Sequence, residues 1–171
     1  MKDTAGDRLF REPGLDWKPV SPKLVTERRL PVAAVAVVGV GLLVAALMLA
    51  INGRSYIGLL IPGVLIVVAT GLNWFVFVPR VVASWRYAER EEDLLVSHGR
   101  LQRKLSVVPY GRMQVIEVSA NPISRRLGIA TVTLVTASAS TDATIPGLPV
   151  AEAHELRDRL AAKGEALSAG L

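Results

Sequence analysis

The 171-residue sequence contains no cysteine and only two histidines. The absence of cysteine excludes disulfides, thiolate metal sites and a cysteine nucleophile. His98 lies at a predicted turn and His154 on a predicted helix, and neither has the spacing of a metal ligand. The sequence also lacks a nucleophile elbow and a glycine-rich phosphate loop. We therefore expect no enzyme, no catalytic residues, no metal, no cofactor and no small-molecule substrate.

Aromatic residues make up only 5% of the sequence, whereas 51% of its residues are hydrophobic. The aliphatic excess lies mostly between Pro31 and Val78. The formal net charge of +5 is compatible with nucleic acid or with an anionic membrane surface. Seven of the 20 Lys and Arg residues precede residue 31, and no basic surface with interleaved aromatic residues is evident. The sequence therefore predicts no nucleic-acid partner, and the lipid bilayer is the expected partner.

Two long apolar runs dominate the first half of the chain. Residues 31–50 carry no charged or strongly polar side chain, and a helix of that length covers roughly 30 Å, the thickness of the hydrocarbon core. Residues 57–78 form the second run, which is interrupted only by Thr70 and Asn73. The first run is too long and begins too late for a cleaved signal peptide, and neither run has the polar face of a soluble helix. We expect two antiparallel transmembrane helices joined by a polar turn at residues 52–55, with Pro31 in the first turn of the first helix.

The distribution of cations predicts the orientation of this hairpin. Lys and Arg residues flank both outer ends, while Arg54 is the only cation in the connection. The positive-inside rule then places the N-terminus and the C-terminal domain in the cytoplasm of a multi-pass cell-membrane protein. The candidate contacts with the membrane surface are Arg28, Arg29, Arg80, Trp85 and Arg86.

Five glycines in the hairpin leave two interpretations open. They either line a contact between the spans or a dimer face, or they reflect the general frequency of glycine in membrane helices. These residues are Gly39, Gly41, Gly58, Gly63 and Gly71. For Asn73, we favour a hydrogen bond between the helices or with lipid headgroups over a role in transport.

Short β-type runs separated by turns follow the hairpin. The predicted strands occupy residues 85–90, 94–98, 101–108, 113–119, 129–136 and 143–145. A terminal helix is predicted to begin at Pro149 and end at Gly164, with one apolar face formed by Val150, Ala153, Leu156 and Leu160. The predicted organisation is a basic N-terminal segment (1–30), a membrane hairpin (31–80), a β domain (84–165) and a tail (166–171).

Several segments in this order resemble the bacterial pleckstrin-homology-like (PH-like) family of YdbS type. They are WKPVSP at residues 17–22, the hairpin, WRY at 85–87, RMQ at 112–114 and RRLG at 125–128. RMQ is similar to the family's R-[IV]-Q signature, with Met113 in place of Ile or Val, and RRLG is similar to its R-x-x-G turn. The resemblance implies a membrane α-helical hairpin plus an α+β PH-like domain, in which a bent, partly open antiparallel β-barrel is capped by the C-terminal helix. It predicts one further short strand within residues 122–127. It also implies a partner, since members are often encoded beside a larger membrane protein with related domains.

Two pairs of residues are candidate contacts for a partner or for lipid. Arg112 and Gln114, two apart on a predicted strand, either grip an acidic partner or support the sheet edge. Arg125 and Arg126, in a turn that Gly128 ends, either bind phosphate or carboxylate groups or remain solvated turn residues. The loop that binds phosphoinositides in PH domains corresponds here to residues 88–93, whose net acidic charge would repel a phosphorylated headgroup.

These patterns favour a non-enzymatic, membrane-anchored interaction module. It would assemble as a homo-oligomer or with a larger membrane protein, in envelope homeostasis or antimicrobial resistance. An anionic-lipid-sensing domain is one alternative, and an accessory subunit of a transporter is another.

Overall fold

The computed structural model describes residues 14–169 with the exception of residues 101 and 138–141. The chain forms two compact units. One is Val25–Arg80, and the other combines the residues on either side of that segment. Leu101, at the start of one predicted strand, lies outside the described residues.

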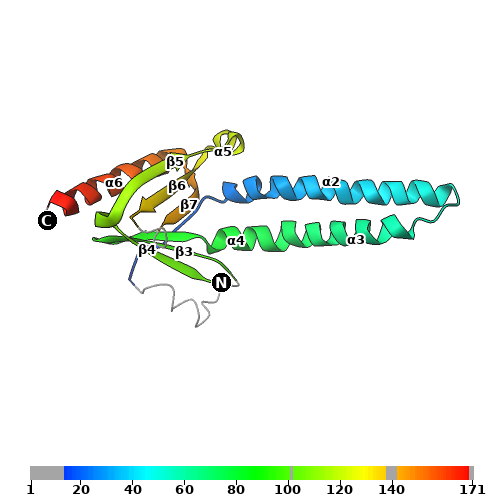
Figure 1. Ribbon diagram of the computed structural model, residues 1–171, viewed down its shortest axis with the longest axis horizontal. Coiled ribbons are helices and arrows are strands. Elements are labelled where there is room, and N and C mark those ends of the chain that lie inside the picture. Colours follow the sequence, from blue (N-terminus) through cyan, green and yellow to red (C-terminus); the bar gives the residue numbers. More distant parts are fainter. Residues whose placement is uncertain (1–13, 101, 138–141, 170–171) are drawn as a thin grey trace. The chain divides into compact units, whose positions relative to one another are not determined.

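The first unit is a hairpin of two long apolar helices. Helix α2 (Lys23–Ile51) is followed, after a turn, by α3 (Ile57–Leu72), a π-helical turn η1 (Asn73–Phe77) and α4 (Val78–Ser84). The segments Lys23–Ile51 and Ile57–Ser84 are each long and apolar enough to cross a membrane. Figure 1 shows the two helices running antiparallel, which confirms the predicted polar turn between them.

The position of Pro31 differs from the prediction, because α2 begins eight residues earlier at Lys23. Residues 23–30 contain Lys, Leu, Glu and Arg, which all favour helix, so the helix extends outward beyond the apolar run. Pro31 therefore lies inside the helix, where it removes one backbone hydrogen bond.

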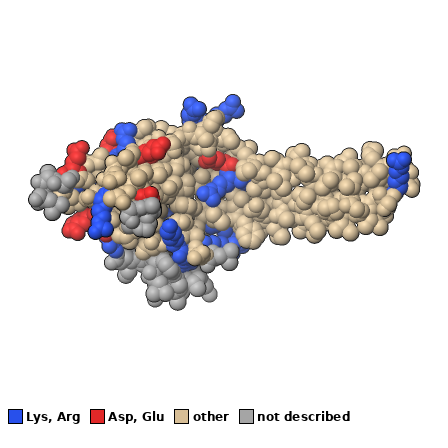
Figure 2. Space-filling view, viewed as in Figure 1, with Lys and Arg blue, Asp and Glu red and all other residues tan. Residues whose placement is uncertain are grey.

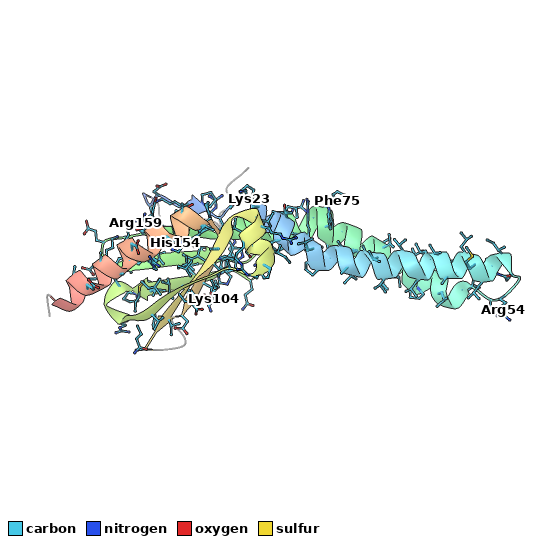
Figure 3. The ribbon with its side chains drawn as sticks, turned by 90° about the horizontal axis from the view of Figure 1, so that it is seen from above. Lys23, Arg54, Phe75, Lys104, His154 and Arg159 are labelled. Carbon is cyan, nitrogen blue, oxygen red and sulfur yellow. The ribbon has the colours of Figure 1, made fainter. Side chains whose placement is uncertain are left out.

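Most side chains of the hairpin are not buried within the structure. In each candidate span only 11% of the most apolar window is buried, whereas a core helix of a soluble protein would be mostly covered. Phe75, on η1, is 76% exposed and projects outward in Figure 3. The face of the hairpin in Figure 2 is almost free of charged side chains, as a lipid-facing surface requires.

Two of the five glycines line the contact between the helices. A Cβ at Gly39 would lie 2.7 Å from Ile66 Cγ2, and one at Gly63 would lie 2.8 Å from Leu43 Cδ2. The other three, Gly41, Gly58 and Gly71, have no atom within 4 Å of a built Cβ. Close approach of the backbones thus explains only Gly39 and Gly63.

Among its described residues, the second unit contains seven antiparallel strands in two sheets. The first sheet has the order β1-β2-β3-β4 and the second the order β5-β6-β7. The strands are β1 (Lys18–Pro19), β2 (Arg86–Glu89), β3 (Asp93–His98), β4 (Lys104–Pro109), β5 (Met113–Ser119), β6 (Ile129–Thr136) and β7 (Ala143–Pro149). The connecting helices are η2 (Tyr110–Arg112) and α5 (Pro122–Leu127), and α6 (Val150–Ala169) ends the described chain.

This arrangement confirms the PH-like fold but leaves its barrel open. Within the described residues, β4 and β5 are the edges of different sheets and do not pair. In Figure 1, α6 runs along the second sheet, where its buried side chains Ala153, Leu156 and Leu160 pack. Val150, which was expected on this apolar face, is exposed.

Two local predictions were wrong. Residues 122–127 form α5 and not a strand, because Asn121 caps the helix, Pro122 occupies its first turn and Gly128 ends it at φ +69°. Gly164 lies inside α6 and does not end it. A Cβ at Gly164 would approach the Tyr110 carbonyl oxygen to 3.4 Å, so this glycine allows the helix to pass close to η2.

The segment before the hairpin supplies a strand that the sequence did not predict. Lys18 and Pro19 pair with Tyr87 and Arg86 of β2, so the hairpin is inserted between two paired strands. The amide of Ser21 then donates to the Gly147 carbonyl at 2.9 Å, and the side chain of Leu24 is buried. Gly147 has φ +72°, and a Cβ built on it would lie 2.8 Å from Leu24 Cβ. The glycine at this position in β7 therefore leaves room for Leu24 at the start of α2.

We expect Gly147→Ala to lower the free energy of unfolding by about 2–4 kcal/mol. An alanine with positive φ costs roughly 1 kcal/mol, and overpacking against Leu24 adds about 1–3 kcal/mol. Gly128→Ala is the matched control, because Gly128 has φ +69° and its built Cβ meets only Lys23 Nζ, at 3.8 Å. Thermal unfolding of the full chain in detergent would compare the two. Equal losses of stability would show that packing of Leu24 on Gly147 does not hold the N-terminal segment.

Candidate functional site

The carboxylate of Glu89, at the end of β2, lies close to three cations of the β domain. Its side chain is 16% exposed and lies 2.9 Å from Arg159 Nη2. Lys163 Nζ and Lys18 Nζ each lie 4.0 Å from a Glu89 oxygen. The Arg159 guanidinium donates hydrogen bonds from both Nε and Nη2 to this carboxylate, and these bonds raise the pKa of Arg159. Glu89 thus joins β1, β2 and α6 through one partly buried negative charge.

Two buried tyrosines extend this network along α6. The Tyr87 hydroxyl donates to the Glu152 carboxylate, and burial, together with that bond, raises the pKa of Tyr87. The Tyr110 hydroxyl donates to the Arg90 carbonyl at 3.1 Å. Burial and the nearby charge of Glu89 raise the pKa of Tyr110 to about 12. Both phenols therefore stay protonated at neutral pH and act as hydrogen-bond donors, not as bases or nucleophiles.

Lys163 completes the attachment of α6. Its ammonium group donates to the Arg90 carbonyl at 2.8 Å and lies 4.8 Å from the centre of the Tyr110 ring. Arg159 and Lys163 of α6 therefore both bind other groups of the same domain. Figure 3 shows Arg159 on this helix. We interpret the network as a structural clamp, because each charged group in it faces another group of the fold.

The two histidines have different surroundings in the described part of the chain. His98 stacks on Trp85 with ring centres 4.3 Å apart, and burial, followed by the charge of Lys104, lowers its pKa. His154 lies exposed on α6. Among the described residues, no group of three or more His, Asp or Glu side chains could hold a metal ion.

The structure separates the first predicted pair of contact residues. Arg112 lies in η2 and β5 begins at Met113, so Arg112 and Gln114 do not share a strand face as predicted. Met113 pairs with Thr136 and Val115 with Val135, which makes Gln114 an extra, bulged residue. Gln114 lines a groove between β5 and α6, whose other walls include Ile116, Leu160 and Gly164.

The second pair stays together on a different element from the one predicted. Arg125 and Arg126 are exposed in the last turn of α5. The neighbouring Gly128 lies beside Lys23, the first residue of α2. Lys23 therefore lies beside the C-terminal end of the short helix that carries Arg125 and Arg126.

The predicted membrane-surface residues have varied surroundings. Arg29 donates to the Trp74 carbonyl at 3.3 Å and lies 5.1 Å from the centre of its ring, so it bridges the two helices of the hairpin. Trp85 has one ring face covered by His98. Arg86 belongs to the central strand β2 and is half-buried. Arg80 is exposed on α4, and Arg28 is half-buried on α2.

Sequence reasoning missed Lys23, and it missed the shared contacts of Lys18, Glu89, Arg159 and Lys163. No local pattern indicates that residues 18, 89 and 159 meet, because their contact depends on the fold. A local signal for α5 was present, however. Asn-Pro followed by Gly six residues later is typical of a short helix with an N-cap and a left-handed C-cap.

Seven antiparallel strands in two sheets with a packed terminal helix define a PH-like domain, and here two membrane-type helices accompany it. A family model described as Bacterial PH domain matches residues 28–164, and the chain belongs to this family. The matched region includes the hairpin and begins after β1.

One curated relative gives the membrane assignment further support. The UPF0699 transmembrane protein YdbS of Bacillus subtilis (strain 168) is 33% identical over 76 residues, which is 44% of this chain and 46% of the relative. The chain thus spans about half the length of this relative. No solved structure matches the chain. The comparison and the two apolar helices together identify a membrane protein.

If Glu89 is the clamp, Glu89→Gln should lower the free energy of unfolding by about 1–3 kcal/mol, since Arg159 and Lys163 lose their counter-charge. The lower half of this range is expected, because Arg159 is partly exposed. Glu155→Gln is the control: this carboxylate is 72% exposed and 3.8 Å from the same arginine, and its loss should cost less than about 0.5 kcal/mol. Thermal unfolding at neutral pH measures both. Similar stabilities for the two variants would contradict the clamp.

Proposed function

We propose that this chain is a non-enzymatic, membrane-anchored interaction module. The hairpin holds the PH-like domain at the cytoplasmic face of the membrane. The domain assembles there with a second copy or with a larger membrane protein that carries related domains. A role in envelope homeostasis or antimicrobial resistance is compatible with such an assembly.

The exposed edge of β5 is the observation that carries this proposal. Within the described residues the backbone of β5 pairs only with β6, so its outer N–H and C=O groups remain available. Its seven residues contain no Lys, Arg or Pro, and the Val115 side chain is 55% exposed. An edge of this kind is a template for pairing with another strand.

The other edges are better protected. β4 begins with Lys104 and ends with Pro109, β1 has only two residues, and β7 contains Pro146. Lysine, proline and short length are the devices by which proteins prevent edge pairing. β5 carries only the bulge at Gln114, which lies at its beginning. Of the described edges, β5 is thus the one that is best suited to a partner strand.

The single charge on β5 also permits pairing with a copy of itself. In an antiparallel pair centred on Ile116, Glu117 of each chain would face Val115 of the other. No like charges would then be opposed, and like charges directly opposite each other destabilise a sheet. The sequence of β5 is therefore compatible with a symmetric dimer.

Assembly through β5 predicts that Val115→Glu reduces crosslinking of the full chain in native membranes at least several-fold. The new glutamate would stand opposite Glu117 of the other chain, and like charges directly opposite each other destabilise a sheet. Val107→Glu is the matched control, since Val107 is also an exposed valine on an edge strand, at 40% exposure on β4. Crosslinking followed by mass spectrometry would count the adducts. Unchanged crosslinking in the Val115 variant would rule out β5 as the assembly edge, and a strictly monomeric wild-type chain would rule out assembly itself.

The cytoplasmic orientation is tested separately by thiol labelling, since the natural sequence has no cysteine. Ser55→Cys lies in the turn of the hairpin and Glu117→Cys lies on β5, and both positions are exposed. In intact cells a membrane-impermeant maleimide should label residue 55, and residue 117 should react only after the cells are opened. The reverse pattern would place the domain outside.

A further inference from the structure

Helix α5 is held rigidly at one corner of the domain. The Asn121 side chain accepts hydrogen bonds from the amides of Ile123 and Ser124, at 2.9 and 2.8 Å. At the other end, the Gly128 amide donates to the Arg125 carbonyl at 3.1 Å, and the Gly128 carbonyl accepts from Val150 at 3.2 Å. Both ends of α5 are therefore capped, and its C-terminal end is also tied to the start of α6.

The outer surface of α5 combines two cations with one apolar side chain. Ser124 is buried against the domain, which leaves Arg125 and Arg126 exposed. Ile123 is 40% exposed and lies three residues before Arg126, on the same side of the helix. In the part of the chain that the structure describes, neither arginine guanidinium forms an ion pair or a hydrogen bond. Basic groups beside an exposed aliphatic group are typical of surfaces that contact a bilayer interface.

Lys23 adds a third cation to this surface and relates it to the membrane. Its ammonium group lies 3.8 Å from the position of a Cβ on Gly128, and Figure 3 shows it at the start of α2. The burial of Leu24 and the Ser21–Gly147 hydrogen bond fix this start against β7. The point at which the chain leaves the domain for the hairpin is thus next to α5.

The length of α2 between Lys23 and the apolar run sets the distance of Lys23 from the hydrocarbon core. Eight residues separate Lys23 from Pro31, and at 1.5 Å per residue they span roughly 12 Å along α2. The headgroup layer occupies about 5–7 Å of this length, and the Debye length at physiological salt is about 8 Å. Lys23 therefore lies within reach of the charge on anionic headgroups.

We propose that Lys23, Ile123, Arg125 and Arg126 form a membrane-docking surface that binds anionic phospholipid headgroups. This surface would orient the domain on the bilayer from which its own hairpin emerges. It requires the hairpin to be in the membrane but does not depend on assembly through β5. An acidic protein partner is a different occupant of the same cations, and the experiment below distinguishes it.

The absence of cysteine allows this contact to be measured in the full chain. A nitroxide on Ile123→Cys reports its depth by its accessibility to oxygen and to a water-soluble nickel chelate. The chain would be placed in nanodiscs of phosphatidylcholine alone or of phosphatidylcholine with phosphatidylglycerol. We expect the label to be shielded from nickel in the anionic discs and accessible in the neutral discs. A label on Glu117→Cys, on β5, serves as control and should not respond to lipid charge.

Loss of the arginines should remove the response. A Lys or Arg near an anionic surface contributes about 1 kcal/mol, which corresponds to roughly fivefold in the ratio of docked to undocked domain. Arg125→Gln with Arg126→Gln should thus lower this ratio about 25-fold, while thermal unfolding of the variant stays close to that of the natural chain. Val115→Glu should leave docking unchanged, so a failure of the assembly proposal would be seen separately.

Two results would overturn the docking surface. One is a label at residue 123 that is equally accessible to nickel in both kinds of disc. A label that remains equally shielded in the anionic discs after loss of both arginines would have the same meaning. The other is shielding that appears in neutral discs and increases with the number of protein copies per disc, since it would identify a protein as the occupant.

Discussion

The pairing of β1 with β2 is the constraint on which the arrangement of this protein depends. These two strands are neighbours in the sheet, yet the whole hairpin lies between them in the sequence. Their pairing brings the entry and exit of the membrane segment to one place on the domain. Leu24 and Gly147 then fix the entry point by close packing. The hairpin is therefore connected at both of its ends to strands of the same sheet.

A second consequence concerns the charges of the β2–β3 connection. Glu89 ends β2 and the acidic residues 91–93 follow, so the region resembles an acidic patch in the sequence. In the fold, however, Glu89 binds three cations, two of them from α6. Arg159 and Lys163 of α6 thus pair with the end of β2 within the domain. Arg125 and Arg126 of α5, by contrast, are exposed.

The two proposed contacts use different kinds of surface, which is why they can act independently. The β5 edge presents backbone hydrogen-bonding groups and one exposed valine, and it is specific for an extended strand. The α5 corner presents positive charge and one isoleucine, and it favours a planar anionic surface. The first contact would join protein to protein in the membrane plane, whereas the second would restrict the tilt of each domain. A module that needs a defined orientation for assembly would benefit from both.

The sequence by itself determined the elements that depend on local pattern. The hairpin follows from two uninterrupted apolar runs, and most strands follow from alternation, as at Val132 and Leu134. The short helix at residues 122–127 was also encoded locally, although the resemblance suggested a strand. Only the tertiary structure decided that residues 18 and 19 form a strand, because two residues carry no periodicity and their pairing partner lies beyond the hairpin. It also decided that Gln114 is a bulge, that Glu89 meets Arg159, and that Lys23 lies beside Gly128 at the end of α5. These contacts link residues far apart in sequence, and such contacts are set by packing and register, which no local pattern records.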